Sequence, residues 1–353
     1  MSTAATVSTV ADQGGVLDGA EASTDLRTRR AVTLRSLQIA LGAVWLLDGL
    51  LQLQPKMFGT GFVTMVLQPA ATGQPSIVRS SIDHVASLVS VHPSAFNAVF
   101  AVVQILIGVG LIFEETVKPA LAASVVWALG VWTIGEGFGM VLTGTASPLT
   151  GAPGAVLLYG LLAFILWPRP ASDRWATRSR PAAAAGLLGV DGTRVVWAAV
   201  WLTQAVLWLL PANRDSTGVS GAIAGAASGE PGWLARLQLS AAHALGGSGT
   251  AVAVILAVVS VAIGLGPLIT RRTTVFLVAG AALSLDYWIL GQSLGGIFTG
   301  MATDPNTGPL VVLLALTLFP SRVLDRRRPS TSVVEAPAGP GAAPSRRQLV
   351  GVG

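Results

Sequence analysis

The chain has 353 residues, of which 52% are hydrophobic and 11% are charged, and its formal net charge is +5. Soluble globular domains carry about 25% charged residues, so this composition excludes an ordinary soluble protein and indicates an integral membrane protein. The chain contains no cysteine, which excludes disulfides, thiolate metal sites, iron–sulfur clusters and covalently attached haem. No aromatic–basic platform accompanies the positive charge, so we expect the lipid bilayer as a partner and no nucleic acid.

Eight apolar segments are long enough, or nearly so, to cross a hydrocarbon core, which takes about 20 helical residues. They lie near residues 36–53, 95–113, 119–142, 153–167, 195–210, 249–268, 274–297 and 308–320. The predicted fold class is therefore an all-α integral membrane protein with eight spans. The predicted order is a disordered cytoplasmic tail (1–34), a first four-helix membrane repeat (35–167), a cytoplasmic linker (168–193), a second four-helix membrane repeat (194–322) and a second disordered cytoplasmic tail (323–353).

The two sets of four spans are related by a shift of 156 residues without a gap, which superimposes Trp45 on Trp201 and Trp132 on Trp288. One register that survives over most of each half is typical of a tandem duplication, so the predicted unit is four transmembrane helices. Because each unit has an even number of spans, the two units share one orientation in the membrane.

Lysine and arginine orient the spans. If the amino terminus is cytoplasmic, 18 of the 22 basic residues lie in the predicted inner segments, and only Lys56, Arg79, Arg214 and Arg236 lie outside. The positive-inside rule therefore predicts that both termini are cytoplasmic.

Two outer loops, at 54–94 and 212–248, follow the first span of each copy. Their mixture of apolar and polar residues predicts short helices at the membrane interface, which either cap the bundle or form a lid over a site. Imidazole and thioether groups suit copper, and the first loop holds two histidines and two methionines: His84, His92, Met57 and Met65. Their irregular spacing and the lack of matching residues in the second loop argue against a metal site.

The third span of each copy carries an aromatic, a polar, a small and a hydroxyl residue on one helical face, counting 100° per residue. These are Trp132, Glu136, Gly139 and Thr143 in the first copy, and Trp288, Gln292, Gly295 and Thr299 in the second. Gly135 with Gly139, and Gly291 with Gly295, also form GxxxG patterns. Such patterns favour the close packing of another helix.

The first span holds Asp48, where the second copy has Gln204. A carboxylate in the apolar part of a span costs about 2.5–3.5 kcal/mol on insertion scales, so it faces a bundle interior or a wet cavity. At a rise of about 1.5 Å per residue, Asp48 and Glu136 lie roughly 20 and 27 Å from the cytoplasmic edge. We expect both carboxyls, with Gln204 and Gln292, to converge near the outer face. The alternative is that each carboxyl is capped locally between packed helices.

Each third span is followed by a segment rich in Thr, Gly and Pro, at 143–153 and 299–309. Glycine and proline force a non-helical turn, and hydroxyl groups satisfy the freed backbone groups. We expect a tight outer hairpin in preference to a re-entrant filter.

Residues 45–55 and 131–139, followed by the Thr-Gly-rich turns, resemble a group of uncharacterised multipass membrane proteins of high-GC Gram-positive bacteria. This resemblance implies a bacterial plasma membrane location. Each four-span half is also similar in outline to DoxX-type membrane proteins, some of which are associated with quinone-linked thiosulfate oxidation. That similarity implies other membrane proteins or a quinone as partners, with Trp132, Glu136 and their counterparts Trp288 and Gln292 lining a quinone pocket.

Three functions remain open. The first is the binding or transport of a small solute, ion or proton at the outer-half polar cluster. The second is a DoxX-like accessory subunit of a quinone-linked redox system, and the third is an assembly factor for membrane complexes. The candidate ligand- or proton-binding residues are Asp48, Glu136, Gln204, Gln292, Trp132, Trp288, Thr143 and Thr299. No Ser-His-Asp set, metal motif, Walker loop or dinucleotide fingerprint is found, so a self-contained enzyme is the least favoured reading and no cofactor is identified.

The predicted topology can be tested by labelling, because the chain has no native cysteine. We expect Ser172→Cys, in the linker, to react with a membrane-impermeant maleimide only after the cells are opened. Ser80→Cys, in the first outer loop, should react in intact cells. Labelling of Ser172→Cys from outside intact cells would show that the topology is wrong.

Overall fold

The computed structural model describes residues 32–169 and 181–319 of the chain. The predicted tails lie almost entirely outside these residues, as does the middle of the predicted linker. The described residues form helices and turns, with one isolated antiparallel bridge between Pro168 and Gly186. The chain is therefore all-α in these two ranges, as its sequence predicts.

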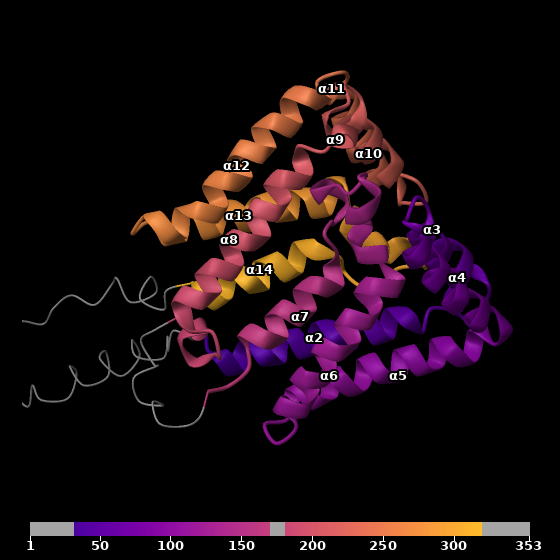
Figure 1. Ribbon diagram of the computed structural model, residues 1–353, viewed down its shortest axis with the longest axis horizontal. Helices are drawn as coiled ribbons and strands as arrows, with labels where there is room; N and C mark the ends of the chain where they lie inside the picture. The colour runs from indigo at the N-terminus through magenta and orange to yellow at the C-terminus, as the bar shows by residue number, and fades with distance from the viewer. Residues whose placement is uncertain (1–31, 170–180, 320–353) are drawn as a thin grey trace, which may run out of the picture.

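The N-terminal half comprises residues 32–169 (Figure 1). Its elements are α2 (Leu34–Gln52), η1 (Pro55–Phe58), η2 (Val63–Leu67), α3 (Gln68–Ala71), α4 (Ser76–Val91), α5 (Pro93–Ile112), α6 (Val117–Gly130), η3 (Val131–Gly135), η4 (Gly137–Thr143), η5 (Pro148–Thr150) and α7 (Ala155–Ile165). The first outer loop thus folds into short helices, as expected.

The C-terminal half comprises residues 181–319. Its elements are η7 (Ala182–Ala185), α8 (Gly189–Trp208), α9 (Pro211–Arg214), α10 (Gly218–Ala226), α11 (Gly232–Leu245), α12 (Gly249–Ile269), α13 (Thr273–Leu290), η8 (Ser293–Thr299) and α14 (Thr307–Leu318). Helix α8 begins inside the segment that we expected to be linker. Residues Ala182 and Ala183 are buried in the main apolar core, so the described end of that segment is packed structure.

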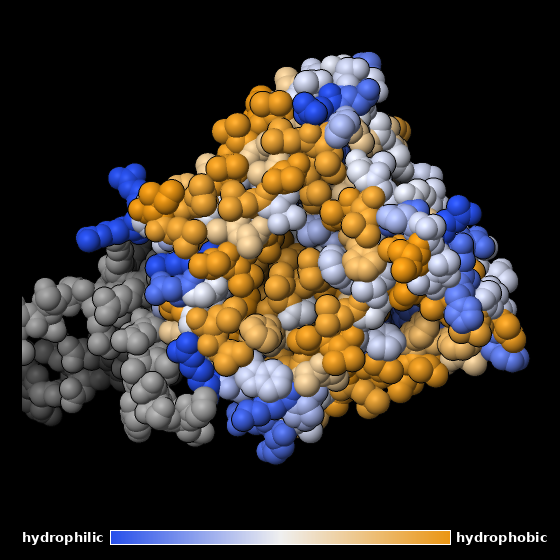
Figure 2. Space-filling model, in the orientation of Figure 1, coloured by the Kyte–Doolittle hydropathy of each residue, from blue (hydrophilic) through white to orange (hydrophobic). Residues whose placement is uncertain are grey.

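Five helical segments among the described residues are long and apolar enough to cross a membrane. They are Leu34–Gln52, Pro93–Ile112, Val117–Gly135, Gly249–Ile269 and Thr273–Thr299. Helices α7 and α14 are apolar but shorter. Figure 2 shows a broad apolar band, with polar residues gathered over α3, α4, α10 and α11 at one end and near the opposite ends of the long helices. This distribution is that of a membrane-embedded protein.

The longest helices pack in pairs, α2 against α5 and α8 against α12. Helices α2 and α5 meet at Gly42 and Gly108, where a Cβ added to either glycine would lie 2.8 Å from the carbonyl oxygen of the other. Small residues allow helix backbones to approach this closely in an apolar environment. Gly264 of α12 faces Ala198 of α8 in the same manner.

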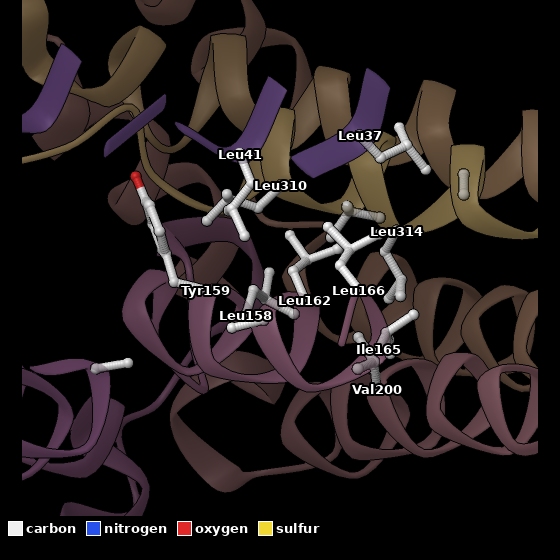
Figure 3. Packing of buried hydrophobic residues seen from close by; sticks show 14 of the residues in the cluster. Leu37, Leu41, Leu158, Tyr159, Leu162, Ile165, Leu166, Val200, Leu310 and Leu314 are labelled. Atoms are coloured by element: carbon white, nitrogen blue, oxygen red, sulfur yellow. The ribbon is translucent and has the colours of Figure 1, made fainter. Parts of the chain in front are cut away.

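One apolar core joins the two halves. Figure 3 shows Leu41 of α2, Leu162 of α7 and Leu310 and Leu314 of α14 meeting in this core. Helices α2, α7, α8 and α14 all contribute side chains to it, and α14 contacts α2, α7 and α8. The halves therefore share a single interior.

The third long helix of each half is broken. After α6, a π turn leads into four residues with left-handed backbone, Gly137 to Met140, whose φ values run from 52° to 60°. In the C-terminal half, Ser293 to Gly296 form the same left-handed turn, with φ between 50° and 80°. Left-handed backbone costs non-glycine residues about 1–2 kcal/mol each, and such strain persists only where surrounding contacts impose it.

This break corrects the prediction of a continuous helix over 119–142. Because α-helical geometry ends before Glu136, the predicted face shared by Trp132, Glu136, Gly139 and Thr143 does not exist. The GxxxG prediction is also wrong. Gly139 takes positive φ beside Pro153, and a Cβ on Gly291 would overlap Leu149 from the other half.

The segments that follow the left-handed turns cross into the opposite half. The N-half connector (residues 144–154) places Leu149 in an apolar cluster with Trp208 and Tyr287. The C-half connector (residues 300–306) places Met301 against the first outer-loop helices. Both connectors are ordered turns, as predicted, but each is docked on the other half and is not a local hairpin.

We expect Gly139→Ala to destabilise the protein strongly. The substitution places a side chain at positive φ, which costs about 1–2 kcal/mol, and its Cβ would also overlap the Pro153 carbonyl. Gly221→Ala on α10 is the matched control, because an added Cβ there meets nothing within 4 Å. Thermal unfolding in detergent should show a lower midpoint for Gly139→Ala alone; equal midpoints would contradict the assignment of the turn.

Candidate functional site

Two side chains from the broken helix of the N-terminal half hold the start of α7. The Trp132 indole N–H donates to the Pro153 carbonyl oxygen over 2.7 Å. Glu136 Oε1 accepts from the Val156 backbone N–H, in the first turn of α7, over 3.1 Å. The first N–H groups of a helix lack partners within the helix, so Glu136 caps α7 from a position outside it.

The C-terminal half repeats both hydrogen bonds. Trp288 donates to the Pro305 carbonyl oxygen over 2.6 Å, and Gln292 Oε1 accepts from the Gly308 N–H over 3.3 Å. Pro153 therefore corresponds to Pro305 and not to Pro309, because the C-half connector is shorter by four residues than a constant shift of 156 implies. A neutral glutamine caps α14, so the capping role does not require a negative charge.

A cavity of about 600 Å³ lies in the N-terminal half and carries three carboxyl groups on its wall. Asp48 comes from α2, Glu136 from the break after α6, and Asp304 from the C-half connector. The rest of the lining is mostly apolar and includes residues of the outer-loop helices, such as Phe62 and Val85. The segment between α2 and α5 therefore forms part of the cavity wall.

Asp48 faces the interior of the bundle, as predicted. Its side chain is 2% exposed and lies beside Trp45, whose indole N–H donates to Ser124 Oγ over 3.0 Å. The Tyr159 ring packs against that of Trp45, with centroids 4.5 Å apart. Within the described residues, however, neither Asp48 Oδ1 nor Tyr159 Oη completes a hydrogen bond.

Asp304 is a site residue that sequence analysis missed. Its two oxygens accept from Thr303 Oγ1 over 2.8 Å and from the Asn306 N–H over 2.7 Å, so by itself it resembles an ordinary turn residue. Burial raises the pKa of Asp304 above its ordinary value, although these two hydrogen bonds oppose the shift. Only the docking of the C-half connector on the N-terminal half brings this carboxyl into the cavity.

The cavity wall is rich in unpartnered acceptors. Three acceptor atoms are buried without a hydrogen-bond partner among the described residues: Asp48 Oδ1, Gln104 Oε1 and Glu136 Oε2. One donor, Trp127 Nε1, is also buried without a partner there. No lysine, arginine or histidine lines the cavity, and none of the ion pairs formed by the described residues involves its three acids. The wall therefore presents carboxyl groups and acceptor atoms without a basic side chain to pair with them.

The other predicted site residues lie elsewhere. Gln204 and Gln292 do not line the cavity, so the expected convergence of four polar side chains is limited to Asp48 and Glu136. Trp132 and Trp288 anchor the connectors. Thr143 Oγ1 and Thr299 Oγ1 donate to the Met140 and Gly296 carbonyl oxygens, each over 2.7 Å, and so close the left-handed turns.

The equivalent region of the C-terminal half is filled with side chains. Trp208 stands 156 residues after Gln52, and Tyr287 stands 156 residues after Val131. Trp208 donates to Tyr287 Oη over 3.1 Å, and their rings pack edge to face with centroids 5.7 Å apart. Leu149 of the N-half connector packs against both rings. One helical framework therefore holds a cavity in one half and a packed core in the other.

The described residues contain no group of three or more His, Asp or Glu side chains arranged to hold a metal ion. In the first outer loop, Met57 is fully buried in an apolar cluster while Met65 is 64% exposed. Their thioethers therefore do not share one environment.

Comparison of the chain with protein-family models, with curated proteins and with solved structures gives no match. The fold and the site by themselves define an all-helical membrane-type protein with an acid-lined internal cavity.

We expect Glu136→Gln to leave stability nearly unchanged, because glutamine already caps α14 in the same way. Glu136→Leu should lower stability by about 1–3 kcal/mol, since the Val156 N–H would lose its buried acceptor. The measurement is the thermal midpoint of both variants in the same detergent. A large loss of stability in Glu136→Gln would show that the charge itself holds the bundle together.

Proposed function

We propose that this chain is an eight-span bacterial plasma-membrane protein, built by tandem duplication, with both termini in the cytoplasm. In this proposal the N-terminal half binds or transports a small solute, ion or proton in the outer half of the membrane. The asymmetric distribution of lysine and arginine supports the orientation. The paired left-handed turns and the paired anchors from Trp132 and Trp288 support the duplication.

One observation carries the functional part of the proposal: the cavity of about 600 Å³ with Asp48, Glu136 and Asp304 on its wall. Cavities that bind small molecules have volumes of about 300–1,000 Å³, with mostly apolar walls and a few polar groups. An unpaired buried carboxyl is costly for folding. A protein that needed only a stable bundle could fill this space, as the C-terminal half does with Trp208 and Tyr287.

The π turn beside the cavity supports the same conclusion, because such turns are often found at functional sites. It spans Val131–Gly135 and leads directly to Glu136. In the C-terminal half, α13 runs as an α-helix to Leu290 at the corresponding place.

A second candidate is a quinone-binding accessory subunit of a redox system. The apolar character of most of the wall favours it, and the unpartnered Trp127 N–H could donate to a quinone carbonyl oxygen. The excess of acidic and acceptor groups favours the first candidate, because a quinone carbonyl requires donors.

The test of the site is native mass spectrometry of the gently solubilised full-length protein and of a variant with a filled cavity. The triple variant Gln52→Trp, Asn97→Ala, Val131→Tyr copies the residues found 156 positions later: Trp208, Ala253 and Tyr287. Asn97 is included because its side chain hydrogen-bonds to Gln52. We expect a small molecule to remain with the wild type and to be lost from the folded triple variant.

The thermal midpoint of the triple variant is measured in parallel to establish that it is folded. A small molecule retained equally by both proteins would contradict binding in this cavity. A retained quinone that the triple variant loses would favour the second candidate.

A further inference from the structure

We propose that the ligand of this cavity is an organic cation with apolar substituents. The inference rests on the proposed function, since it names the ligand class of the same site. It follows from four features of the cavity: its acidic groups, their arrangement, its aromatic wall and its rim.

The carboxyls and unpartnered acceptors of the wall favour a ligand that carries positive charge. Asp48, Glu136 and Asp304 line the cavity, and no basic side chain does. The buried, unpartnered oxygens of Asp48, Gln104 and Glu136 are acceptors. Asp48 is 2% exposed, so its carboxyl is not hydrogen-bonded by water at the protein surface. An anionic ligand would place further acceptors beside these groups and leave them without partners.

The three carboxyls are not arranged to bind one metal ion. They come from α2, from the break after α6 and from the C-half connector, and no three acidic side chains are arranged to hold a metal ion in the described ranges. Calcium needs six to eight oxygen ligands, and magnesium needs near-octahedral geometry, at about 2.0–2.6 Å. A cavity of about 600 Å³ therefore suits a larger cation better than a bare metal ion.

An aromatic wall lies in the same cavity. The rings of Phe62 and Phe100, and those of Phe100 and Trp127, have centroids 5.8 Å apart. Trp45 lines the cavity beside Asp48. Aromatic faces attract cations and also bury apolar groups. Such a wall accepts the substituents of an organic cation, whereas a strongly hydrated inorganic ion gains little from it.

The rim of the cavity has an apolar and a polar side. Val126, which is 71% exposed, and Gly130 lie on the flank of α6, among the apolar residues of the bundle surface. Thr145 and Thr150 of the N-half connector are exposed on the polar side. A ligand with apolar substituents can therefore reach the carboxyls from the apolar flank of the bundle.

The test uses two probes of similar shape and opposite charge, tetraphenylphosphonium and tetraphenylborate. Each is titrated calorimetrically into the full-length protein in a non-ionic detergent, with a detergent-only titration as the reference. We expect one tetraphenylphosphonium per chain and binding of tetraphenylborate at least about tenfold weaker, a difference of ~1.4 kcal/mol or more. The triple variant with the filled cavity should not bind tetraphenylphosphonium.

Neutral variants then test the carboxyls one at a time. Asp48→Asn, Glu136→Gln and Asp304→Asn should each weaken tetraphenylphosphonium binding several-fold or more, with thermal midpoints close to that of the wild type. Asp286→Asn is the matched control, because Asp286 is an exposed acid of α13 that does not line the cavity. It should leave the affinity unchanged.

Equal affinities for the two probes, or no effect of any of the three cavity substitutions, would overturn the assignment of a cationic ligand. A different outcome separates the ligand class from the proposed function. If native mass spectrometry finds a neutral molecule that the triple variant loses, while tetraphenylphosphonium does not bind, the site stands and the cationic class is wrong.

Discussion

The architecture depends on one constraint: a helix broken in apolar surroundings must have its freed backbone groups satisfied from within the protein. Each half meets it in the same way. An indole N–H binds a carbonyl oxygen of the connector, and a glutamate or glutamine accepts from the first turn of the next helix. In both halves the left-handed turn lies between these two side chains and the connector that they hold. These bonds fix the starts of α7 and α14. The remainder of each connector packs on the opposite half.

The two halves use this common framework for different purposes. In the C-terminal half, Trp208, Tyr287 and Leu149 fill the space, and close packing of this kind contributes stability. In the N-terminal half the corresponding space is a cavity that holds unpaired acids, which oppose folding. Because one core joins both halves, the packed half can stabilise the half that holds the cavity. An ancestral pair of identical units would have been free to specialise in this way after the proposed duplication.

Some parts of this arrangement were accessible from the sequence and others were not. The apolar segments predicted eight helical regions, and a helix lies in each of them within the described residues. The interior position of Asp48 followed from the cost of a lipid-exposed carboxyl. The break at Gly137 was missed, because the spacing of Gly135 and Gly139 is equally compatible with helix packing and with a left-handed turn. The contribution of Asp304 was missed because a Thr-Asp-Pro-Asn segment is typical of any turn.

The sequence by itself determined the apolar, all-helical character of this protein and the positions of its apolar helices, because these depend on composition and on local or periodic patterns. The tertiary structure decided where the third helix breaks, which carboxyls share a cavity and which half is filled. These features depend on contacts between residues far apart in the chain. Asp304 reaches Asp48 and Glu136 only because the C-half connector docks on the N-terminal half, and no pattern within either segment encodes that contact.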